Sequence, residues 1–140
     1  MPEVVLLDTG PLVALVDDDE EHHAWATGRL RAIKPPLLVC EAVLTEACFL
    51  LHNHSRARLQ IRLWIQSGFL IHRPLDGPTV VHVLSLMERY ANVPMAFADA
   101  CLVALAESQP QAQIFTIDPD FLIYRAQGDR PLALIAPFAQ

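Results

Sequence analysis

Five apolar runs of strand length recur along the chain, and segments with helical periodicity separate them. The runs read EVVLL, LLVC, FLIH, QIFTI and LALIA, at residues 3–7, 37–40, 69–72, 113–117 and 132–136. The helical patterns cover residues 12–16, 20–33, 42–52, 56–66, 79–90 and 98–107. Strands that are apolar throughout and alternate with helices are typical of a parallel sheet with helices on both faces. The sequence therefore predicts an α/β fold, a three-layer α/β/α sandwich with a central parallel sheet.

The size of the chain predicts one domain. A length of 140 residues with a hydrophobic fraction of 53% is typical of a globular unit with its own core. We therefore expect residues 1–140 to form a single domain. Apolar runs stop at about seven residues, far short of the roughly 18 that span a bilayer. The opening MPEVVLLD has no basic segment before its apolar run. We expect a cytoplasmic protein that does not contact a membrane.

The cysteines predict no covalent or metal framework. Cys40, Cys48 and Cys101 are odd in number, widely spaced and set among apolar residues. Disulfide and zinc frameworks use paired, regularly spaced cysteines. We expect all three to be reduced packing residues.

The net charge of −6 argues at first against a nucleic-acid partner. The acids are unevenly spread, because DDDEE at residues 17–21 holds five of the sixteen. We expect this run to form a solvated helix start, where negative charge suits the helix dipole.

Four other acids stand alone in apolar surroundings. Asp8 ends the first apolar run and Asp118 follows QIFTI, so both lie at the carboxyl end of an expected parallel strand, where such sheets bind their ligands. Glu46 is the only charge in VLTEACFLL, and Asp99 is the only charge in MAFADACLVALA. Helices this apolar are buried on nearly all sides, so we expect their acids to be buried as well.

Each acid taken singly has a structural interpretation. Asp8 or Asp118 would cap the following helix, Glu46 would pair with an arginine, and Asp99 would bond backbone amides in a first helical turn. Four such acids together favour a shared pocket. Carboxylates in one pocket repel each other, and divalent cations with oxygen ligands relieve that repulsion.

These segments, in this order and spacing, resemble the PIN-domain ribonucleases, and within them the VapC-type toxins of bacterial toxin–antitoxin pairs. The resemblance covers essentially the whole chain and rests on VLLDTGPLVAL, VLTEACFLL, PMAFADACLVALAE and IFTIDPDF. It places the family's four acids at Asp8, Glu46, Asp99 and Asp118, and its supporting hydroxyls at Thr9 and Thr116.

Three neighbouring positions qualify the match. Glu41 is expected to cap its helix, and Asp120 is a possible extra ligand outside the core pattern. Ala96 departs from the family, because many relatives carry a polar residue three positions before the third acid. That departure concerns the outer metal shell and not the four acids.

The resemblance implies a Mg²⁺- or Mn²⁺-dependent endoribonuclease. Asp8 and Asp99 would be the principal metal ligands, and Glu46 and Asp118 would complete the site directly or through water. Two metals about 4 Å apart can generate a hydroxide nucleophile and stabilise the leaving oxygen at phosphorus. The resemblance also implies a homodimer and a cognate antitoxin that covers an apolar groove and occludes the site. Setting aside four site carboxylates changes the net charge from −6 to −2, which weakens the objection to RNA.

Other polar and aromatic residues have a preferred structural interpretation. Arg58 and Arg62 lie one turn apart on one expected helix face, as a solvated stripe or as an RNA phosphate contact. We expect packing or helix-end roles, and no catalytic or metal role, for the histidines His22, His23, His52 and His54. We expect core or interface roles for Trp25 and Trp64.

Two alternatives to a toxin remain: a housekeeping PIN ribonuclease without an antitoxin, and a binding module that kept the fold but lost catalysis. A neighbouring gene for a small DNA-binding protein would favour the toxin, and metal-dependent cleavage would exclude the module. Other phosphate chemistries fit poorly. Gly10 stands where dehalogenase-type phosphatases carry a second Asp, and the chain has no glycine-rich phosphate-binding loop.

Overall fold

The computed structural model of the protein describes residues 3–139 and has a parallel sheet at its centre. Five strands of this described part form the sheet in the order β3-β2-β1-β4-β7, and each neighbouring pair is parallel. Their bounds are β1 (Val4–Leu7), β2 (Leu37–Val39), β3 (Leu70–His72), β4 (Ala112–Phe115) and β7 (Leu134–Ile135). The expected α/β sandwich with a central parallel sheet is confirmed.

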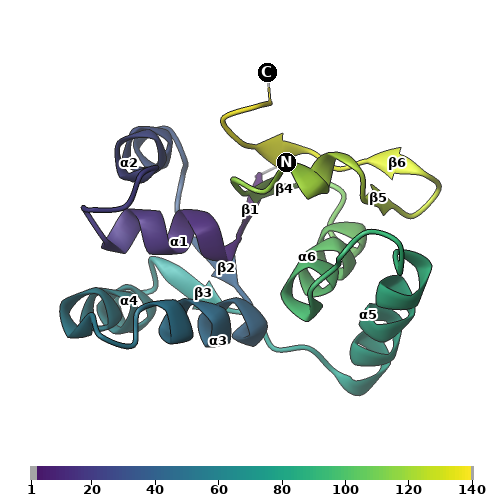
Figure 1. The fold of residues 1–140 in the computed structure, drawn as a ribbon, viewed down its shortest axis with the longest axis horizontal. Helices are drawn as coiled ribbons and strands as arrows, with labels where there is room; N and C mark the ends of the chain where they lie inside the picture. The colour runs from purple at the N-terminus through teal and green to yellow at the C-terminus, as the bar shows by residue number, and fades with distance from the viewer. Residues whose placement is uncertain (1–2, 140) are drawn as a thin grey trace.

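Helices cover both sides of this sheet (Figure 1). Figure 1 shows α1 to α4 on one side of the strands and α5 and α6 on the other. Their bounds are α1 (Thr9–Val16), α2 (His23–Arg31), α3 (Glu41–Leu50), α4 (Ser55–Ser67), α5 (Gly77–Arg89) and α6 (Phe97–Ser108). All six expected helices are present, with ends shifted by up to three residues.

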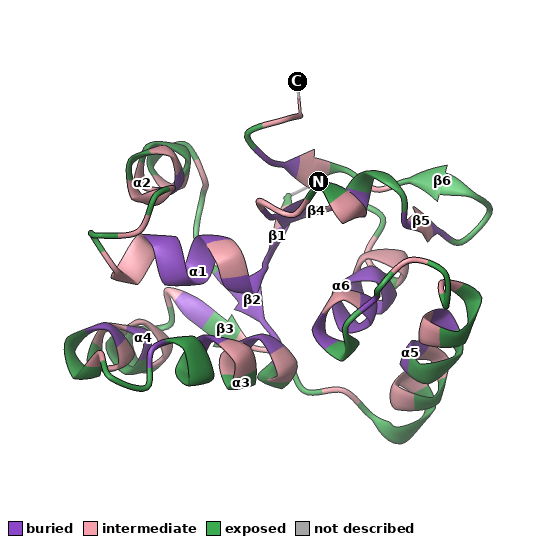
Figure 2. Ribbon diagram, viewed as in Figure 1, coloured by how far each residue is buried: buried purple, intermediate pink, exposed green. Residues whose placement is uncertain are grey.

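The core lies between the central strands and α6 (Figure 2). Leu6 and Leu7 of β1 are 1% and 0% exposed, and every residue of α6 from 100 to 105 is buried. On the opposite side, the Trp25 ring of α2 packs edge-on against Phe115 of β4, with centroids 5.6 Å apart. Buried on both faces, β1 and β4 place the residues that follow them rigidly.

Two short elements after β4 were not expected from the sequence. A 3₁₀ helix, η1 (Pro119–Leu122), follows β4 directly. Strands β5 (Arg125–Ala126) and β6 (Arg130–Pro131) then form a small antiparallel hairpin. Elements of two to four residues are too short to produce a periodic pattern.

The acidic run at residues 17–21 does not start a helix. Asp17 ends α1, and α2 begins only at His23, so the run forms the loop between them. The expected helix start was wrong because the run lies past the end of one helix and before the first turn of the next. Its solvated character is confirmed for Asp18, Asp19 and Glu21, which are exposed.

Helix α3 is less buried than its composition predicts. Phe49 and Leu50 are 75% and 59% exposed, and Cys48 is exposed as well. The expectation of packing roles therefore holds for the buried Cys40 and Cys101 but is wrong for Cys48. Within residues 3–139, no helix combines the length and apolar character that crossing a membrane requires.

Candidate functional site

Asp8 belongs to both the sheet and the helix that follows. Its N–H donates to Phe115 O at 3.0 Å, which extends β1 by one residue, and its C=O accepts from Leu12 N as α1 begins. The side chain is only 5% exposed. Its Oδ1 accepts from Thr9 N at 2.7 Å, and its Oδ2 accepts from the Thr116 hydroxyl at 2.7 Å. Asp8 therefore caps α1 and is at the same time one of the candidate site acids.

A glycine lets the start of α1 approach the end of β4. A Cβ atom at Gly10 would lie 2.6 Å from Cγ1 of Ile117, far inside van der Waals contact. Ile117 lies between Thr116 and Asp118, so the missing side chain at Gly10 lets α1 pack close to the segment that carries both residues. Composition and periodicity do not reveal such a close approach between distant segments.

Thr116 also organises Asp118. The Thr116 hydroxyl accepts from Asp118 N at 3.0 Å while it donates to Asp8. The Asp118 side chain in turn accepts from Asp120 N at 2.9 Å and caps η1. One fully buried hydroxyl thus connects the ends of β1 and β4.

Glu46 reaches the same place from α3. Its Oε1 accepts from the Thr9 hydroxyl at 2.8 Å, so Thr9 holds Asp8 through its amide and Glu46 through its hydroxyl. Glu46 is half-buried, and no arginine pairs with it among the described residues. The two threonines predicted as supporting residues both contact predicted acids.

Asp99 lies in the first turn of α6. Its Oδ2 accepts from Ala96 N at 3.2 Å, which is the backbone-amide contact expected of a first-turn acid. The helix around it is buried, but Asp99 itself is only half-buried. Ala96 contributes only this backbone amide.

Burial raises the pKa of Asp8 to about 6, and this effect outweighs the opposing hydrogen bonds. The bonds from Thr116 and Thr9 N lower the pKa, whereas the charges of Asp118 and Glu46 raise it. A buried carboxyl group with a raised pKa is a frequent feature of functional sites.

Burial is also the main reason why the pKa of Asp99 rises to about 7, followed by the charge of Asp8. The Ala96 amide opposes the shift, and Asp118 and Glu46 add to it. Asp8, Glu46, Asp99 and Asp118 therefore share one electrostatic environment, as the sequence predicted.

No protein cation neutralises this group of acids in the described part of the chain. The salt bridges within residues 3–139 join His54 to Asp17, His72 to Glu41 and His82 to Glu107. Asp8 is compensated only by neutral donors, a hydroxyl and an amide. Its negative charge therefore remains available to an external cation.

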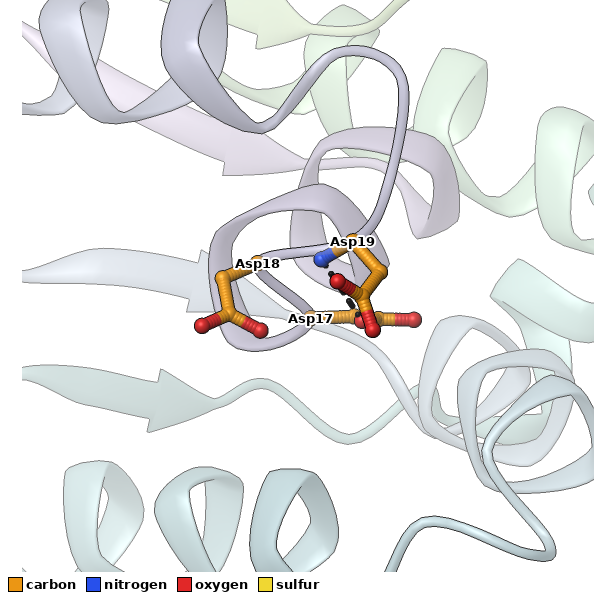
Figure 3. Close-up of side chains that lie close together, drawn as sticks. All are labelled: Asp17, Asp18 and Asp19. Atoms are coloured by element: carbon orange, nitrogen blue, oxygen red, sulfur yellow. Dashed lines mark hydrogen bonds between the residues drawn. The ribbon is translucent and has the colours of Figure 1, made fainter.

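The most closely spaced acids lie elsewhere (Figure 3). Within residues 3–139, one set of three acids has carboxylate oxygens all within 4.8 Å of one another, and it is Asp17, Asp18 and Asp19. Asp17 accepts from Asp19 N at 3.1 Å, so the turn itself brings these side chains together. Asp8, Glu46, Asp99 and Asp118 contain no such set of three, so their carboxylates are spaced more widely.

The remaining acids of interest have local partners. Cys40 occupies the N-cap position of α3, so Glu41 does not cap the helix as expected. Glu41 lies in the first turn instead, with its carboxylate 3.1 Å from His72 Nε2. Asp120 is half-buried in the first turn of η1, and its role as an extra ligand remains a prediction.

Arg58 forms hydrogen bonds with the end of the preceding helix, α3. Its guanidinium donates to the carbonyls of Leu51 and His52, just past the end of α3. Arg62 is exposed and donates only to Gln66, one turn along α4. Contact of either arginine with RNA remains a prediction, and Arg58 already has a structural function.

His23, His52, His54 and both tryptophans have structural contacts, as expected, whereas His22 stands at the N-cap position of α2 without a side-chain hydrogen bond at its buried Nδ1. His23 bonds Ala14 O, His52 bonds Phe49 O, and His54 accepts from Ala57 N at the start of α4. The Trp64 ring packs on Phe69, with centroids 5.2 Å apart.

A large cleft lies away from the acids. It measures about 760 Å³, lies between α5, α6 and the β5–β6 hairpin, and includes His82, Arg89, Glu107 and Arg125 in its lining. None of the four acids lines it. Cavity size is therefore a weaker guide here than the chemistry of the residues.

Two smaller hollows border Glu46. One of about 480 Å³ is lined by Thr9, Thr45, Glu46, Phe49 and Leu50. The other, of about 360 Å³, is lined by Phe97 of α6 together with residues of α3 that include Glu46. Glu46 therefore borders an apolar surface formed by exposed side chains of α3 and α6.

One residue near the acids was missed altogether. Tyr124 is fully buried, and the charges of Asp99, Asp120 and Asp118 act on its hydroxyl. It follows the short helix η1, for which the sequence carries no periodic signal.

Together, the fold and these residues define an α/β/α sandwich with an acidic site at the carboxyl end of a parallel sheet. Residues 5–126 match the PIN domain family, and the chain belongs to that family. Curated protein sequences contain no significant match to the chain.

Solved structures share the fold. VapC20 of Mycobacterium tuberculosis, a toxin that cleaves the sarcin–ricin loop, superposes with a TM-score of 0.70 at 21% identity, over 83% of this chain and 91% of that chain. A toxin–antitoxin complex from Klebsiella pneumoniae gives 0.67 at 16% identity, over 97% and 99% of the two chains. DNA-bound VapBC from Salmonella typhimurium gives 0.63 at 12%, over 97% and 98%. The family predicted from the sequence is confirmed.

Proposed function

We propose that this chain, as one nuclease domain over residues 1–140, is a divalent-metal-dependent endoribonuclease and the toxin of a toxin–antitoxin pair. The observation that carries the proposal is the group of four carboxylates at the sheet edge, which no protein cation neutralises. A non-catalytic module would gain nothing from four repelling acids, two of them with strongly raised pKa values.

The donor set fits Mg²⁺ or Mn²⁺. It consists of carboxylate oxygens, which these hard cations prefer, with a negative charge that burial makes costly to leave unpaired. Asp8 and Asp99 would be the principal ligands, and Glu46 and Asp118 would complete the site directly or through water. When bound, such an ion stabilises charge at phosphorus and lowers the pKa of water.

The protein's own contribution is orientation. Thr116 fixes one oxygen of Asp8 and the backbone of Asp118, so the ends of two strands keep a constant relation. Thr9 fixes the other oxygen of Asp8 and one oxygen of Glu46. Orienting partners of this kind typically change metal affinity or activity by about 10–100-fold.

The partner we propose is a cognate antitoxin that covers the apolar surface beside Glu46. The solved relatives include a toxin–antitoxin complex and a DNA-bound VapBC complex. In this chain, Phe49 and Leu50 are exposed next to Glu46, and a partner packed on them would also close the acidic site. Exposed apolar side chains in a group are typical of interaction surfaces.

We also propose a cytoplasmic homodimer. Val81 and Leu84 of α5 are 68% and 49% exposed, which gives a second copy an apolar helix face to cover. Sedimentation of the purified chain tests this. A dimer that becomes monomeric in Val81→Glu supports α5 as the interface, and a monomeric wild type contradicts the dimer.

Cleavage mapping on total RNA tests the activity. Purified protein should cleave RNA with Mg²⁺ or Mn²⁺, and excess chelator should stop the reaction. Asp8→Asn should be inactive, whereas Asp76→Asn, which changes the exposed cap of α5, should keep full activity. Cleavage that continues unchanged in chelator would exclude the metal mechanism.

Expression in bacteria tests the partner. The chain alone should slow growth, and co-expression of the neighbouring small protein should restore it. Normal growth at a high level of nuclease-active protein would favour the housekeeping ribonuclease. A folded protein that neither binds Mn²⁺ nor cleaves RNA would favour the binding module.

A further inference from the structure

Tyr124 connects two of the segments that carry acids. Its hydroxyl donates to Pro94 O at 3.2 Å, and Pro94 lies in the loop that leads into α6. Its own N–H donates to Asp120 O, within η1, the helix that Asp118 caps. The Tyr124 side chain is 0% exposed, so the hydroxyl reaches the Pro94 carbonyl from inside the core.

Aromatic packing holds the ring of Tyr124 in one place. It meets Phe121 of η1 edge-on, with centroids 5.3 Å apart, and Tyr90 at the end of α5, with centroids 5.2 Å apart. Edge-to-face pairs of this kind contribute specific orientation as well as burial. A ring that is fixed on two sides directs its hydroxyl at a fixed point.

The Pro94 carbonyl, which accepts from the Tyr124 hydroxyl, lies close in the chain to the amide that binds Asp99. Pro94 lies two residues before Ala96, whose N–H donates to Asp99 Oδ2 at 3.2 Å. A shift of the Pro94 carbonyl therefore moves the amide that orients the carboxylate. No other side-chain donor to the Pro94 carbonyl is present among the described residues.

Burial, and then the charge of Asp99, raise the pKa of Tyr124, and a hydrogen bond between its hydroxyl and the Asp99 carboxylate acts in the same direction. Asp120 and Asp118 act in the same direction. The hydroxyl of Tyr124 therefore borders the acidic site at Asp99.

We propose that Tyr124 is a positioning residue, which holds the Asp99 segment at a fixed distance from the Asp118 segment so that both carboxylates can serve one metal site. This inference rests on the proposed function. It assigns Tyr124 no contact with RNA or with the reacting atoms.

Tyr90 provides a matched control. Its hydroxyl also makes one hydrogen bond, accepting from Arg125 N at 2.9 Å, and its ring packs against that of Tyr124. The Tyr90 hydroxyl makes no bond to the loop before Asp99 among the described contacts. Tyr90→Phe and Tyr124→Phe therefore remove the same group at similar cost to the fold.

The test measures Mn²⁺ affinity by electron paramagnetic resonance of the free ion, together with melting curves and RNA cleavage. Both variants should melt about 2–6 °C below wild type, since each loses one hydrogen bond. Tyr124→Phe should bind Mn²⁺ about tenfold or more weakly, as expected when an orienting partner is removed. Its cleavage should recover as Mn²⁺ is raised, whereas Tyr90→Phe should differ from wild type by less than about twofold.

A donor placed back on the ring gives a second variant. The amino group of p-aminophenylalanine at position 124 should restore Mn²⁺ affinity to within about threefold of wild type, since it can again donate to the Pro94 carbonyl. This variant decides the matter if Tyr124→Phe does not fold. Weak Mn²⁺ binding by a folded p-aminophenylalanine protein would overturn the assignment.

Equal Mn²⁺ affinities for Tyr124→Phe and Tyr90→Phe would also overturn it, because Tyr124 would then be a core aromatic only. A wild-type protein that neither binds Mn²⁺ nor cleaves RNA would overturn the proposed function instead. The two failures are therefore distinguishable.

Discussion

The hydroxyl of Thr116 donates a 2.7 Å hydrogen bond to Oδ2 of Asp8, across 108 positions of the chain. This bond joins the ends of two adjacent parallel strands, and both side chains are buried. It holds the Asp8 carboxylate in place but does not neutralise it, since a hydroxyl carries no charge. The Asp8 carboxylate is therefore oriented before any cation arrives.

Replacing Thr116 by valine should separate orientation from packing. Valine has nearly the same shape but cannot donate to Asp8 or accept from Asp118 N. We expect a loss of about 1–3 kcal/mol in the free energy of unfolding, because buried polar groups lose their partner. Cleavage should fall about tenfold or more. Thr27→Val, the same change on α2, is the control and should alter neither the free energy of unfolding nor cleavage. Cleavage at the wild-type rate by Thr116→Val would contradict the role of Thr116 in orienting Asp8.

Gly10→Ala tests the close approach of α1 and β4. The added methyl group would meet Ile117 at 2.6 Å, so Ile117 must move, and it lies between Thr116 and Asp118. We expect a loss of about 1–3 kcal/mol from overpacking and a loss of cleavage that exceeds the loss of folded protein. Gly28→Ala, where nothing lies within 4 Å, is the control and should be neutral or stabilising. Unchanged cleavage in Gly10→Ala would mean that Ile117 yields without moving its neighbours.

The sequence predicted the layers and the grouping of the four acids better than it predicted exposure. Apolar runs and helical periods locate β1, β4 and α6 because these elements are buried, and burial produces the pattern. The same logic failed for α3, since exposed Phe49 and Leu50 have the composition of a core. An interaction surface and a core look alike in composition, and only the packed structure separates them.

The four acids could be singled out because each ends or interrupts an apolar segment. Their supporting contacts could not be found in that way. The bond between Thr9 and Glu46 spans 37 positions, and the one between Tyr124 and Pro94 spans 30. Such pairs depend on how elements pack, which local pattern does not encode. The short η1 and the β5–β6 hairpin were not predicted for a related reason, because elements of two to four residues cannot show a hydrophobic period.

The metal-free protein should lose stability as pH rises. The folded-state pKa values of Asp8 and Asp99, about 6 and about 7, lie above the ordinary 3.8. Between about pH 4 and 7 the folded chain therefore binds more protons than the unfolded chain, and the free energy of unfolding falls. A shift of about two units at Asp8 alone corresponds to about 2–3 kcal/mol.

Melting in chelator across this pH range measures the effect, and the decline should level off above about pH 7. Mn²⁺ affinity should rise over the same range, because ligand carboxylates must lose their protons. Metal-free stability that increases steadily from pH 4 to 7 would contradict the raised pKa values. The double variant Asp8→Asn, Asp99→Asn should show a flatter profile.

Although Arg58 and Arg62 share a helix face, replacing Arg58 should lower stability, whereas replacing Arg62 should leave stability nearly unchanged. Arg58→Ala removes the donor to two carbonyls past α3 and should cost about 1 kcal/mol in the free energy of unfolding. Arg62→Ala should cost less than about 0.5 kcal/mol, the usual limit for an exposed site. If Arg62 contacts RNA phosphate, its loss should raise KM and reduce the salt dependence of cleavage with kcat unchanged. Equal stability of both variants would contradict the capping role of Arg58.

Asp99→Asn tests burial and repulsion together. Asparagine keeps the shape of the side chain, and its carbonyl oxygen can still accept from Ala96 N, but it removes one charge from the group. The metal-free variant should be as stable as wild type or more stable, by about 1–2 kcal/mol, which is the scale of a pKa shift of about one unit. It should lose cleavage and most of the stabilisation by Mn²⁺, since that gain depends on the dissociation constant of the metal.

A purely structural Asp99 predicts the opposite result. Removing a charge from the first turn of α6 would then cost up to about 1 kcal/mol and leave the metal response intact. Asp76→Asn is the matched control, because Asp76 accepts from Thr79 N at the start of α5 and lies in the cleft away from the acids. It should lose stability and keep the wild-type Mn²⁺ shift. Melting of the three proteins, each in chelator and in Mn²⁺, therefore decides whether Asp99 belongs to a metal site. If Asp99→Asn loses stability and keeps the wild-type Mn²⁺ shift, as expected for Asp76→Asn, Asp99 is not a metal ligand.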